Sequence, residues 1–267
     1  MRTTVTATAD LPPLVAGTAS ARFLAFDTST ERMSIAVGDG ARLWQHEGPG
    51  AAQSSTTLIP AVMQLMADAG LQLAQLDAIA FGRGPGSFTG LRTACAVAQG
   101  LALGAGVPVL PIDTLAALAE EARFAWQQAH PGVALPTQLT AALDARMDEM
   151  YVQHFCLAGK AYRSLGPCTL VRPEALTLGT PTGGGHLLAG NVLGVYADRL
   201  PALPEGSVAL TLLPTAAAML RLAPAMLAAG MARPADQALP LYVRDKVAQT
   251  TDERAQAKLA AQHAAAA

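Results

Sequence analysis

Short apolar runs alternate with amphipathic stretches along the first half of the chain. The runs predict strands at 22–26, 33–37, 42–45, 78–81 and 107–110. The stretches between and after them predict helices at 55–69, after the glycine-rich segment 82–92, and from Asp113 to Trp126. Pro60 fits the first of these helices only if it falls in the first turn. The predicted order is β-β-β-α-β-α-β-α.

A similar order begins again near residue 138. The pattern predicts strands at 138–143, 150–155, 162–165 and 186–189, a short helix at 173–178 and a longer helix at 215–229. An aspartate follows the first strand of each half, Asp27 in one and Asp144 in the other. We interpret this echo as two similar lobes that face each other across a cleft, with both aspartates at its mouth. An ordinary turn also favours aspartate, and that alternative stays open.

The predicted organisation is a disordered extension (1–21), a first lobe (22–112), a second lobe (113–247) and a tail (248–267). The chain is 51% hydrophobic, which suffices for a large core, and no apolar run is long enough to cross a membrane. Its formal net charge of -2 disfavours a strong intrinsic nucleic-acid binder. The three cysteines form no C-x-x-C pair, which favours a reducing cytoplasmic compartment. The histidine spacing predicts no metal site.

The segment Gly82–Arg92 concentrates four glycines and a proline just before a helix. Glycine lets the backbone approach another surface closely, and Ser87 or Thr89 can cap the helix that follows. Free N–H groups at a helix start can bind an anion or a partner. The segment matches neither the Walker A pattern nor the dinucleotide fingerprint. The alternative is a tight strand-to-helix turn without a ligand.

The chain resembles the TsaB (YeaZ) family, the dimerisation subunit of the bacterial complex that makes threonylcarbamoyladenosine in tRNA. The resemblance covers about 23–247. It is most specific in Gly82–Arg92 and in Leu143–Tyr151, and further matches lie at 24–30, 98–102, 114–119 and 240–245. It implies an α/β actin-like ATPase fold (ASKHA, RNase H-like) with two duplicated β-β-β-α-β-α lobes. Ser54 stands where the family often has a histidine, and we expect it still to cap the helix.

The resemblance also implies a function. The chain would be a non-catalytic subunit that binds and activates TsaD, the catalytic subunit. TsaD would transfer a threonylcarbamoyl group to the N6 amine of an adenosine beside the anticodon. The ATPase TsaE would dock near the same junction, this chain would form homodimers when its partner is absent, and tRNA would be contacted only indirectly. TsaD carries a metal-binding H-x-x-x-H motif, which this chain lacks.

The resemblance places the partner surface on the helices at 55–69 and 88–103. The small side chains of the second helix would let another helix approach closely, so we expect Ala98→Glu to keep the fold but abolish pairing. The alternative is that the same stripe faces the protein's own sheet. The predicted contact residues are Leu58, Val62, Leu65, Met66, Phe88, Leu91, Ala94, Cys95, Ala98, Leu101 and Ala102.

A vestigial nucleotide site between the lobes is a further expectation, with at most weak binding of ATP or ADP and Mg²⁺ there or at a shared site. Its predicted residues are Asp27, Thr28, Ser29, Gly84, Gly86, Ser87 and Asp144. The alternative function is a stand-alone small-molecule kinase, in which Asp27 would hold Mg²⁺ through water and Asp144 would orient the nucleophile. A metallopeptidase has no support in the histidine spacing.

Five basic residues have no role fixed by the sequence. Arg83, Arg92 and Arg146 are the cations nearest to the predicted site, and no lysine accompanies them. Phosphate, a carbonyl or a carboxylate would each suit Arg83 and Arg92. We expect Arg244, like Lys246, to lie in a solvated C-terminal segment rather than to contact tRNA.

Overall fold

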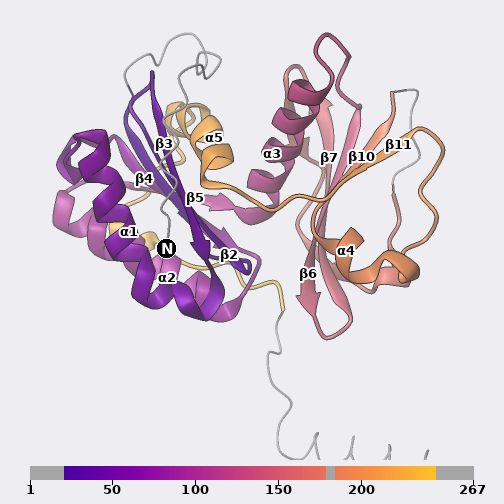
Figure 1. The fold of residues 1–267 in the computed structure, drawn as a ribbon, viewed down its shortest axis with the longest axis horizontal. Coiled ribbons are helices and arrows are strands. Elements are labelled where there is room, and N and C mark those ends of the chain that lie inside the picture. Colours follow the sequence, from indigo (N-terminus) through magenta and orange to yellow (C-terminus); the bar gives the residue numbers. More distant parts are fainter. Residues whose placement is uncertain (1–20, 179–183, 245–267) are drawn as a thin grey trace, which may run out of the picture.

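The first lobe is built on a five-stranded sheet with the order β3-β2-β1-β4-β5. The computed structural model describes residues 21–178 and 184–244 (Figure 1). In this sheet β1 pairs antiparallel with β2 and parallel with β4, β2 pairs antiparallel with β3, and β4 pairs parallel with β5. Its strands are β1 (Phe23–Asp27), β2 (Arg32–Gly38), β3 (Leu43–Pro49), β4 (Ala78–Gly84) and β5 (Val109–Asp113).

Helices cover both faces of this sheet. The helices α1 (Ser54–Ala69) and α2 (Phe88–Ala105) form the outer layer, and their buried side chains pack on Leu24, Phe26 and Ile35. The helix α5 (Ala216–Ala228) packs on the opposite face, against Phe23 and Ala25. The alternation of side chains along β1 explains why one strand serves two clusters.

The second sheet repeats the first. Its order is β11-β10-β6-β7-β8, with antiparallel β6–β7 and β7–β8 pairs and parallel β6–β10 and β10–β11 pairs. The predicted duplication is therefore confirmed, although β9, β11 and α4 (Val192–Tyr196) were not predicted. The strands are β6 (Gln138–Arg146), β7 (Glu149–Ala158), β8 (Ala161–Ser164), β9 (Thr169–Val171), β10 (His186–Ala189) and β11 (Ser207–Leu210).

The short 3₁₀ helices mark the connections between these elements. They are η1 (Ala51–Gln53), η2 (Leu73–Gln75), η3 (Pro173–Ala175), η4 (Ala197–Arg199) and η5 (Ala235–Gln237). The predicted helix at 173–178 is reduced to η3. Gly70 ends α1 in the left-handed conformation that glycine favours, with φ 67°.

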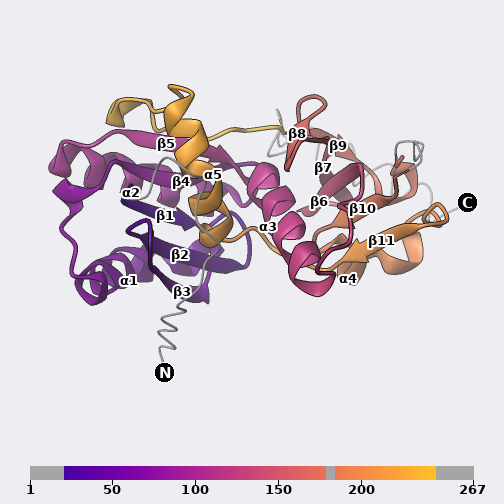
Figure 2. The ribbon, with the colours of Figure 1, turned by 90° about the horizontal axis from the view of Figure 1, so that it is seen from above.

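The predicted lobe boundary needs correction at the C-terminal end. The helix α5 follows the second sheet in sequence but packs on the first, and Arg233 pairs with Val109 of β5. The helix α3 (Thr114–Ala129) lies between the sheets, side by side with α5 (Figures 1 and 2). The chain thus returns to the first lobe after completing the second, because the apolar face of β1, β2 and β4 needs cover from α5.

The position of Pro60 also differs from the expectation. It lies beyond the first turn of α1, because six residues of α1, 54–59, precede it. Pro60 is exposed, so the backbone hydrogen bond that its missing N–H removes lies on the solvent side of the helix. Among the described residues, no helix is long and apolar enough to cross a membrane.

Candidate functional site

A cleft of about 350 Å³ lies between the two lobes. The first lobe lines it with Ser29, Glu31 and the start of α2. The second lobe lines it with the end of β6 and the turn that follows. The C-terminal segment 241–244 forms another part of its wall. The cleft is therefore where any ligand shared by the two lobes would bind.

The turn after β1 is sealed against the glycine-rich segment. Asp27 is 1% exposed, and its Oδ1 accepts hydrogen bonds from the backbone N–H of Ser29 at 2.8 Å and from the Ser29 hydroxyl at 2.6 Å. The Thr28 hydroxyl donates to the carbonyl oxygen of Gly90 at 2.7 Å. Burial raises the pKa of Asp27. These polar groups are thus directed into the protein rather than into the cleft.

Three glycines of this segment are explained by packing. A Cβ atom on Gly86 would lie 2.5 Å from the carbonyl oxygen of Ser29. A Cβ atom on Gly82 would overlap the Asp27 carboxylate, and one on Gly90 would overlap the Thr28 carbonyl. The turn can approach only because these positions carry no side chain. The tight strand-to-helix turn is therefore the form that the segment takes.

The helix start that this turn leads into is capped and partly occupied. The Ser87 hydroxyl accepts from the Gly90 N–H at 3.4 Å, as one of the two predicted caps. The Ser87 N–H donates to the carbonyl oxygen of Ser29 at 2.7 Å. One of the N–H groups expected to be free for an anion is therefore used inside the protein.

The predicted nucleotide residues separate into two groups. Ser29, Gly86, Ser87 and Asp144 line the cleft, whereas Asp27, Thr28 and Gly84 do not. Asp27, which we expected at the mouth of the cleft, lies buried beneath it because the turn 27–30 folds onto the glycine-rich segment.

Asp144 is held by its own lobe. It accepts hydrogen bonds from the Tyr196 hydroxyl at 2.7 Å and from the Arg146 N–H at 2.8 Å. Its backbone N–H donates to Asn191 at 2.9 Å. Burial and the neighbouring carboxylate raise the pKa of Tyr196 to about 12, so this hydroxyl stays a donor at neutral pH. The orientation of Asp144 is therefore set by hydrogen bonds within the second lobe.

The turn between β6 and β7 is strained. Arg146, Met147 and Asp148 are three successive residues in the left-handed region, with φ values of 62°, 56° and 60°. This conformation costs about 1–2 kcal/mol for each residue other than glycine. Arg199 pairs with Asp148 at 2.7 Å, and Arg244 donates to the Arg146 carbonyl oxygen at 3.3 Å. The sequence located this turn but gave no sign of its backbone conformation.

The arginines near the cleft have defined partners. Arg83 pairs with Asp113 at 2.5 Å, and Arg92 donates to the Tyr242 hydroxyl at 3.2 Å. Arg244 pairs with Glu149 at 2.5 Å with a side chain only 16% exposed, so the expectation of a solvated Arg244 was wrong. Glu149 of β7 and the carbonyl oxygen of Arg146 hold the Arg244 guanidinium in place. Lys246 lies outside the described residues.

The predicted partner residues on α1 and α2 are mostly buried in the first lobe. Leu58, Val62 and Ala98 are 0% exposed and pack against the sheet. This corrects the predicted contact set, because a residue in the core cannot also meet a partner. The same burial holds for Leu65, Met66, Leu91, Ala94, Cys95 and Ala102, while Leu101 is partly buried and Phe88 is exposed.

The opposite side of these two helices is exposed and has its own apolar and small residues. Ile59 and Met63 of α1 are 48% and 49% exposed, and Leu103 of α2 is 78% exposed. Ala96, Gly100 and Gly104 follow one another at intervals of four along α2, and all three are exposed. A Cβ atom on either glycine would meet nothing within 4 Å. We call these six residues the outer face.

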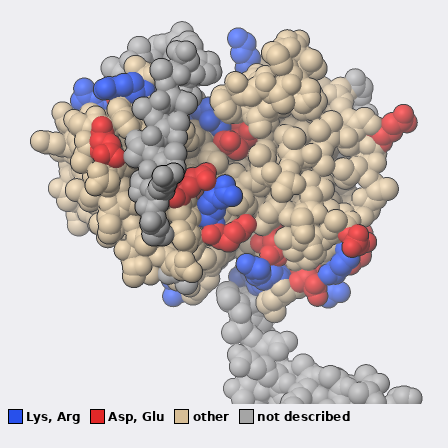
Figure 3. Space-filling view, viewed as in Figure 1, with Lys and Arg blue, Asp and Glu red and all other residues tan. Residues whose placement is uncertain are grey.

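Charged side chains on the face drawn in Figure 3 do not form a basic stripe. Acidic and basic groups lie close together along the junction of the lobes and at the lower edge of the second lobe (Figure 3). Among the described residues, no group of three or more His, Cys, Asp or Glu side chains could hold a metal ion.

Comparison with known proteins identifies the family. A family model described as "TsaD: tRNA N6-adenosine threonylcarbamoyltransferase" matches residues 50–252. The curated "tRNA threonylcarbamoyladenosine biosynthesis protein TsaB" of Escherichia coli is 33% identical over 235 residues, which cover 85% of this chain and 96% of that protein. The chain belongs to the TsaB family.

Other TsaB-family proteins agree. The protein of the same name from Haemophilus influenzae is 46% identical over 131 residues, 48% of this chain and 51% of that protein. The structure of YeaZ from Pseudomonas aeruginosa matches at 38% identity with a TM-score of 0.73, covering 83% of this chain and 99% of that one. The predicted actin-like fold is thereby confirmed.

One TsaB-family position departs from the expectation made for it. Ser54 does not cap α1, because α1 begins at Ser54 and its N-cap is Gln53. The Ser54 side chain is buried, and its hydroxyl donates to the Ala51 carbonyl oxygen at 2.6 Å. It joins η1 to α1 instead.

Proposed function

We propose that this TsaB-family chain is a non-catalytic partner subunit in the biosynthesis of threonylcarbamoyladenosine in tRNA, where it binds and activates the catalytic subunit TsaD. The names of its relatives and the match to the TsaD family model support this proposal. The reacting atoms would then be held by TsaD, and this chain would position that subunit. Both proteins would act in the cytoplasm. TsaE would dock near the same junction, and tRNA would be contacted only indirectly.

The outer face of α1 and α2 is the observation that carries the proposal. Each glycine in a helix interior destabilises the helix by about 1 kcal/mol relative to alanine. Gly100 and Gly104 fill no tight space within the chain itself, so their own packing does not require glycine. A helix from another subunit could approach α2 closely over Ala96, Gly100 and Gly104. The exposed Ile59, Met63 and Leu103 would flank that contact with apolar surface.

The same outer face suits a second copy of this chain as well as TsaD, since both would carry helices of the same fold. We propose that homodimers use it when TsaD is absent. A stable interface of this kind would bury on the order of 1,600 Å² in total.

The interior of the first lobe supports a non-catalytic role. A kinase needs carboxylate and hydroxyl groups that reach phosphate and Mg²⁺ in the cleft. Asp27 and Thr28 instead bond to Ser29 and Gly90. We therefore propose that ATP or ADP binds this chain at most weakly and that a stand-alone kinase is the lesser alternative.

Reconstitution of the transfer reaction tests the proposal. TsaD is supplied with tRNA and threonylcarbamoyl adenylate, with and without this chain, and modified adenosine is quantified. We expect transfer to depend on the chain but to fall less than about threefold with its Asp144→Asn variant. Asp144 is the predicted site carboxylate that faces the cleft. A loss of a hundredfold or more in that variant, or transfer that does not need the chain, would contradict the proposal.

A further inference from the structure

The C-terminal segment Ala238–Arg244, here called the strap, crosses from one lobe to the other. It begins in the first lobe, where Ala238 is 1% exposed and its carbonyl oxygen accepts from Gln99 of α2 at 3.3 Å. It ends on the second lobe at Arg244. Leu241 to Arg244 line the cleft between these two points. The strap therefore closes one side of the cleft with the protein's own backbone.

The first half of the strap is fixed to the first lobe. The Leu241 N–H donates to the carbonyl oxygen of Arg83 at 2.7 Å. The Tyr242 ring lies 5.3 Å from that of Phe88, and Arg92 both donates to the Tyr242 hydroxyl and stacks 3.8 Å over the Phe88 ring. Leu241 and Tyr242 are thus held by a backbone hydrogen bond, an aromatic contact and a side-chain hydrogen bond, and the cation–π contact within α2 orients Arg92 and Phe88 toward Tyr242.

The second half of the strap is fixed to the second lobe. Val243 packs on the cluster that contains Leu143 and Tyr151. Arg244 pairs with Glu149 and also contacts the carbonyl oxygen of Arg146 and the sulfur of Met147. These contacts hold the strained turn after β6. Four consecutive residues, 241 to 244, therefore connect both lobes.

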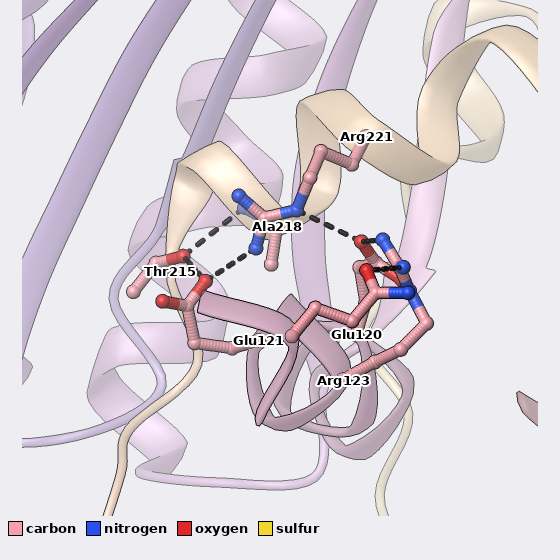
Figure 4. A network of polar contacts seen from close by, with 7 residues as sticks. Glu120, Glu121, Arg123, Thr215, Ala218 and Arg221 are labelled. Carbon is pink, nitrogen blue, oxygen red and sulfur yellow. Dashed lines mark hydrogen bonds and ion pairs between the residues drawn. The ribbon is translucent and has the colours of Figure 1, made fainter. Parts of the chain in front are cut away.

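A second connection lies at the junction of α3 and α5. Arg221 of α5 donates to Glu120 at 2.8 Å and to Glu121 at 2.6 Å, both on α3, and Glu121 also accepts from Thr215 at 2.7 Å (Figure 4). Because α5 covers the first sheet and α3 packs on the second, this network joins the lobes without the strap. No residue of the network lines the cleft.

We propose that the strap is a latch that, together with the α3–α5 network, holds the two lobes at a fixed separation without a ligand. In a two-lobed protein joined at one place, the lobes can move about that place as a hinge. A second connection across the cleft removes this freedom. The proposal concerns this chain alone and does not depend on its partner or on the proposed function.

Hydrogen–deuterium exchange of the full chain tests the latch. Arg244→Ala removes the anchor on the second lobe and touches no group of the first. We expect amide exchange to become at least tenfold faster in 143–151, next to the lost contact, and also in 84–92 on the opposite lobe. The strands β1 and β2 should keep their rates. The radius of gyration from solution scattering should rise.

Two further variants make the test decisive. Arg233→Ala is the matched control, because the side chain of this arginine bonds the Gly230 and Ala232 carbonyl oxygens within the first lobe, and its loss should leave 143–151 unchanged. Glu149→Gln removes the same ion pair from the second lobe and replaces Arg244→Ala if that variant does not fold. Faster exchange confined to 143–151, or equally faster exchange throughout the chain including β1, would overturn the proposal.

Discussion

Gly90 and Thr28 are packed backbone to backbone, with the Thr28 hydroxyl donating to the Gly90 carbonyl oxygen at 2.7 Å. A methyl group on Gly90 would overlap the Thr28 carbonyl oxygen. Through this contact the first turn of α2 is joined to the turn after β1. The glycine-rich segment and the end of β1 that faces it are therefore one structural unit.

We expect Gly90→Ala to lower the free energy of unfolding by about 2–3 kcal/mol or more, as overpacking of a tight contact does. Gly100→Ala, in the same helix but in open space, should raise it by up to about 1 kcal/mol, because alanine is the better helix former. Urea unfolding of both variants measures the difference. Equal midpoints would show that Gly90 is not under steric constraint.

The secondary structure was largely predictable because it follows from local patterns. The runs at 22–26 and 138–143 are apolar enough to predict buried strands, and Gly70 marks the end of α1. The duplication followed from their order. The packing of α5 on the first sheet was not predictable, because its apolar stripe would fit either lobe.

The partner residues were misplaced for a related reason. The helix α2 has small residues on both sides, Ala94 and Ala98 facing inward and Ala96 and Gly100 facing outward. A stripe of small residues is equally consistent with close packing on the chain's own sheet and with close packing on another protein. Only the buried fraction of each residue separates the two, and that depends on the tertiary fold. The strap had no periodic pattern to reveal it.

Ala98→Glu, which the sequence led us to expect as a folded variant, should instead fail to fold or unfold well below the native temperature. Ala98 is 0% exposed and lies in the hydrophobic core between α2 and the first sheet. A carboxylate there would be buried without a partner, a class of change that destabilises by several kcal/mol. Circular dichroism during heating measures this. A native-like melting temperature would mean that Ala98 does not lie in the core.

Removal of the Arg221 side chain should destabilise the protein by about 1.5–3 kcal/mol. Buried Glu120 keeps its pair with Arg123, but Glu121 is left with only the Thr215 hydroxyl as a partner. The side chains of Arg221 and Glu120 are only 10% and 7% exposed. Arg32→Ala is the control. The side chains of Arg32 and Glu47 are 56% and 50% exposed, and exposed pairs of this kind contribute about 0–1 kcal/mol. Chemical denaturation compares the two variants. Similar losses of unfolding free energy in the two variants would show that the Arg221 pairs contribute no more than an exposed ion pair.

Stability should fall as the pH is lowered through the ordinary titration range of histidine. Thr140 bridges His154 at 2.9 Å and His186 at 2.8 Å, and burial lowers the pKa of both histidines. The unfolded chain then binds protons that the folded chain does not, so the stabilising contribution is complete above the unfolded pKa and is lost as the pH falls. Each histidine adds at most about 1.4 kcal/mol per pH unit.

His154→Gln should make that dependence shallower between pH 7 and pH 5, because one of the two protons is no longer taken up on unfolding. Urea midpoints at several pH values give the slope. A slope that is unchanged, or steeper, in His154→Gln would exclude this histidine as a source of the pH dependence.

If the outer face of α1 and α2 binds TsaD, as we propose, a charge placed in the middle of that face should weaken the complex. Gly100→Glu places a carboxylate in the middle of that face, and Gly194→Glu makes the same change at an exposed, open helical position in the second lobe. Binding of TsaD to each folded variant is measured by calorimetry. We expect Gly100→Glu to weaken binding at least a hundredfold and Gly194→Glu to leave it within threefold of the native chain. Native affinity in Gly100→Glu would contradict the claim.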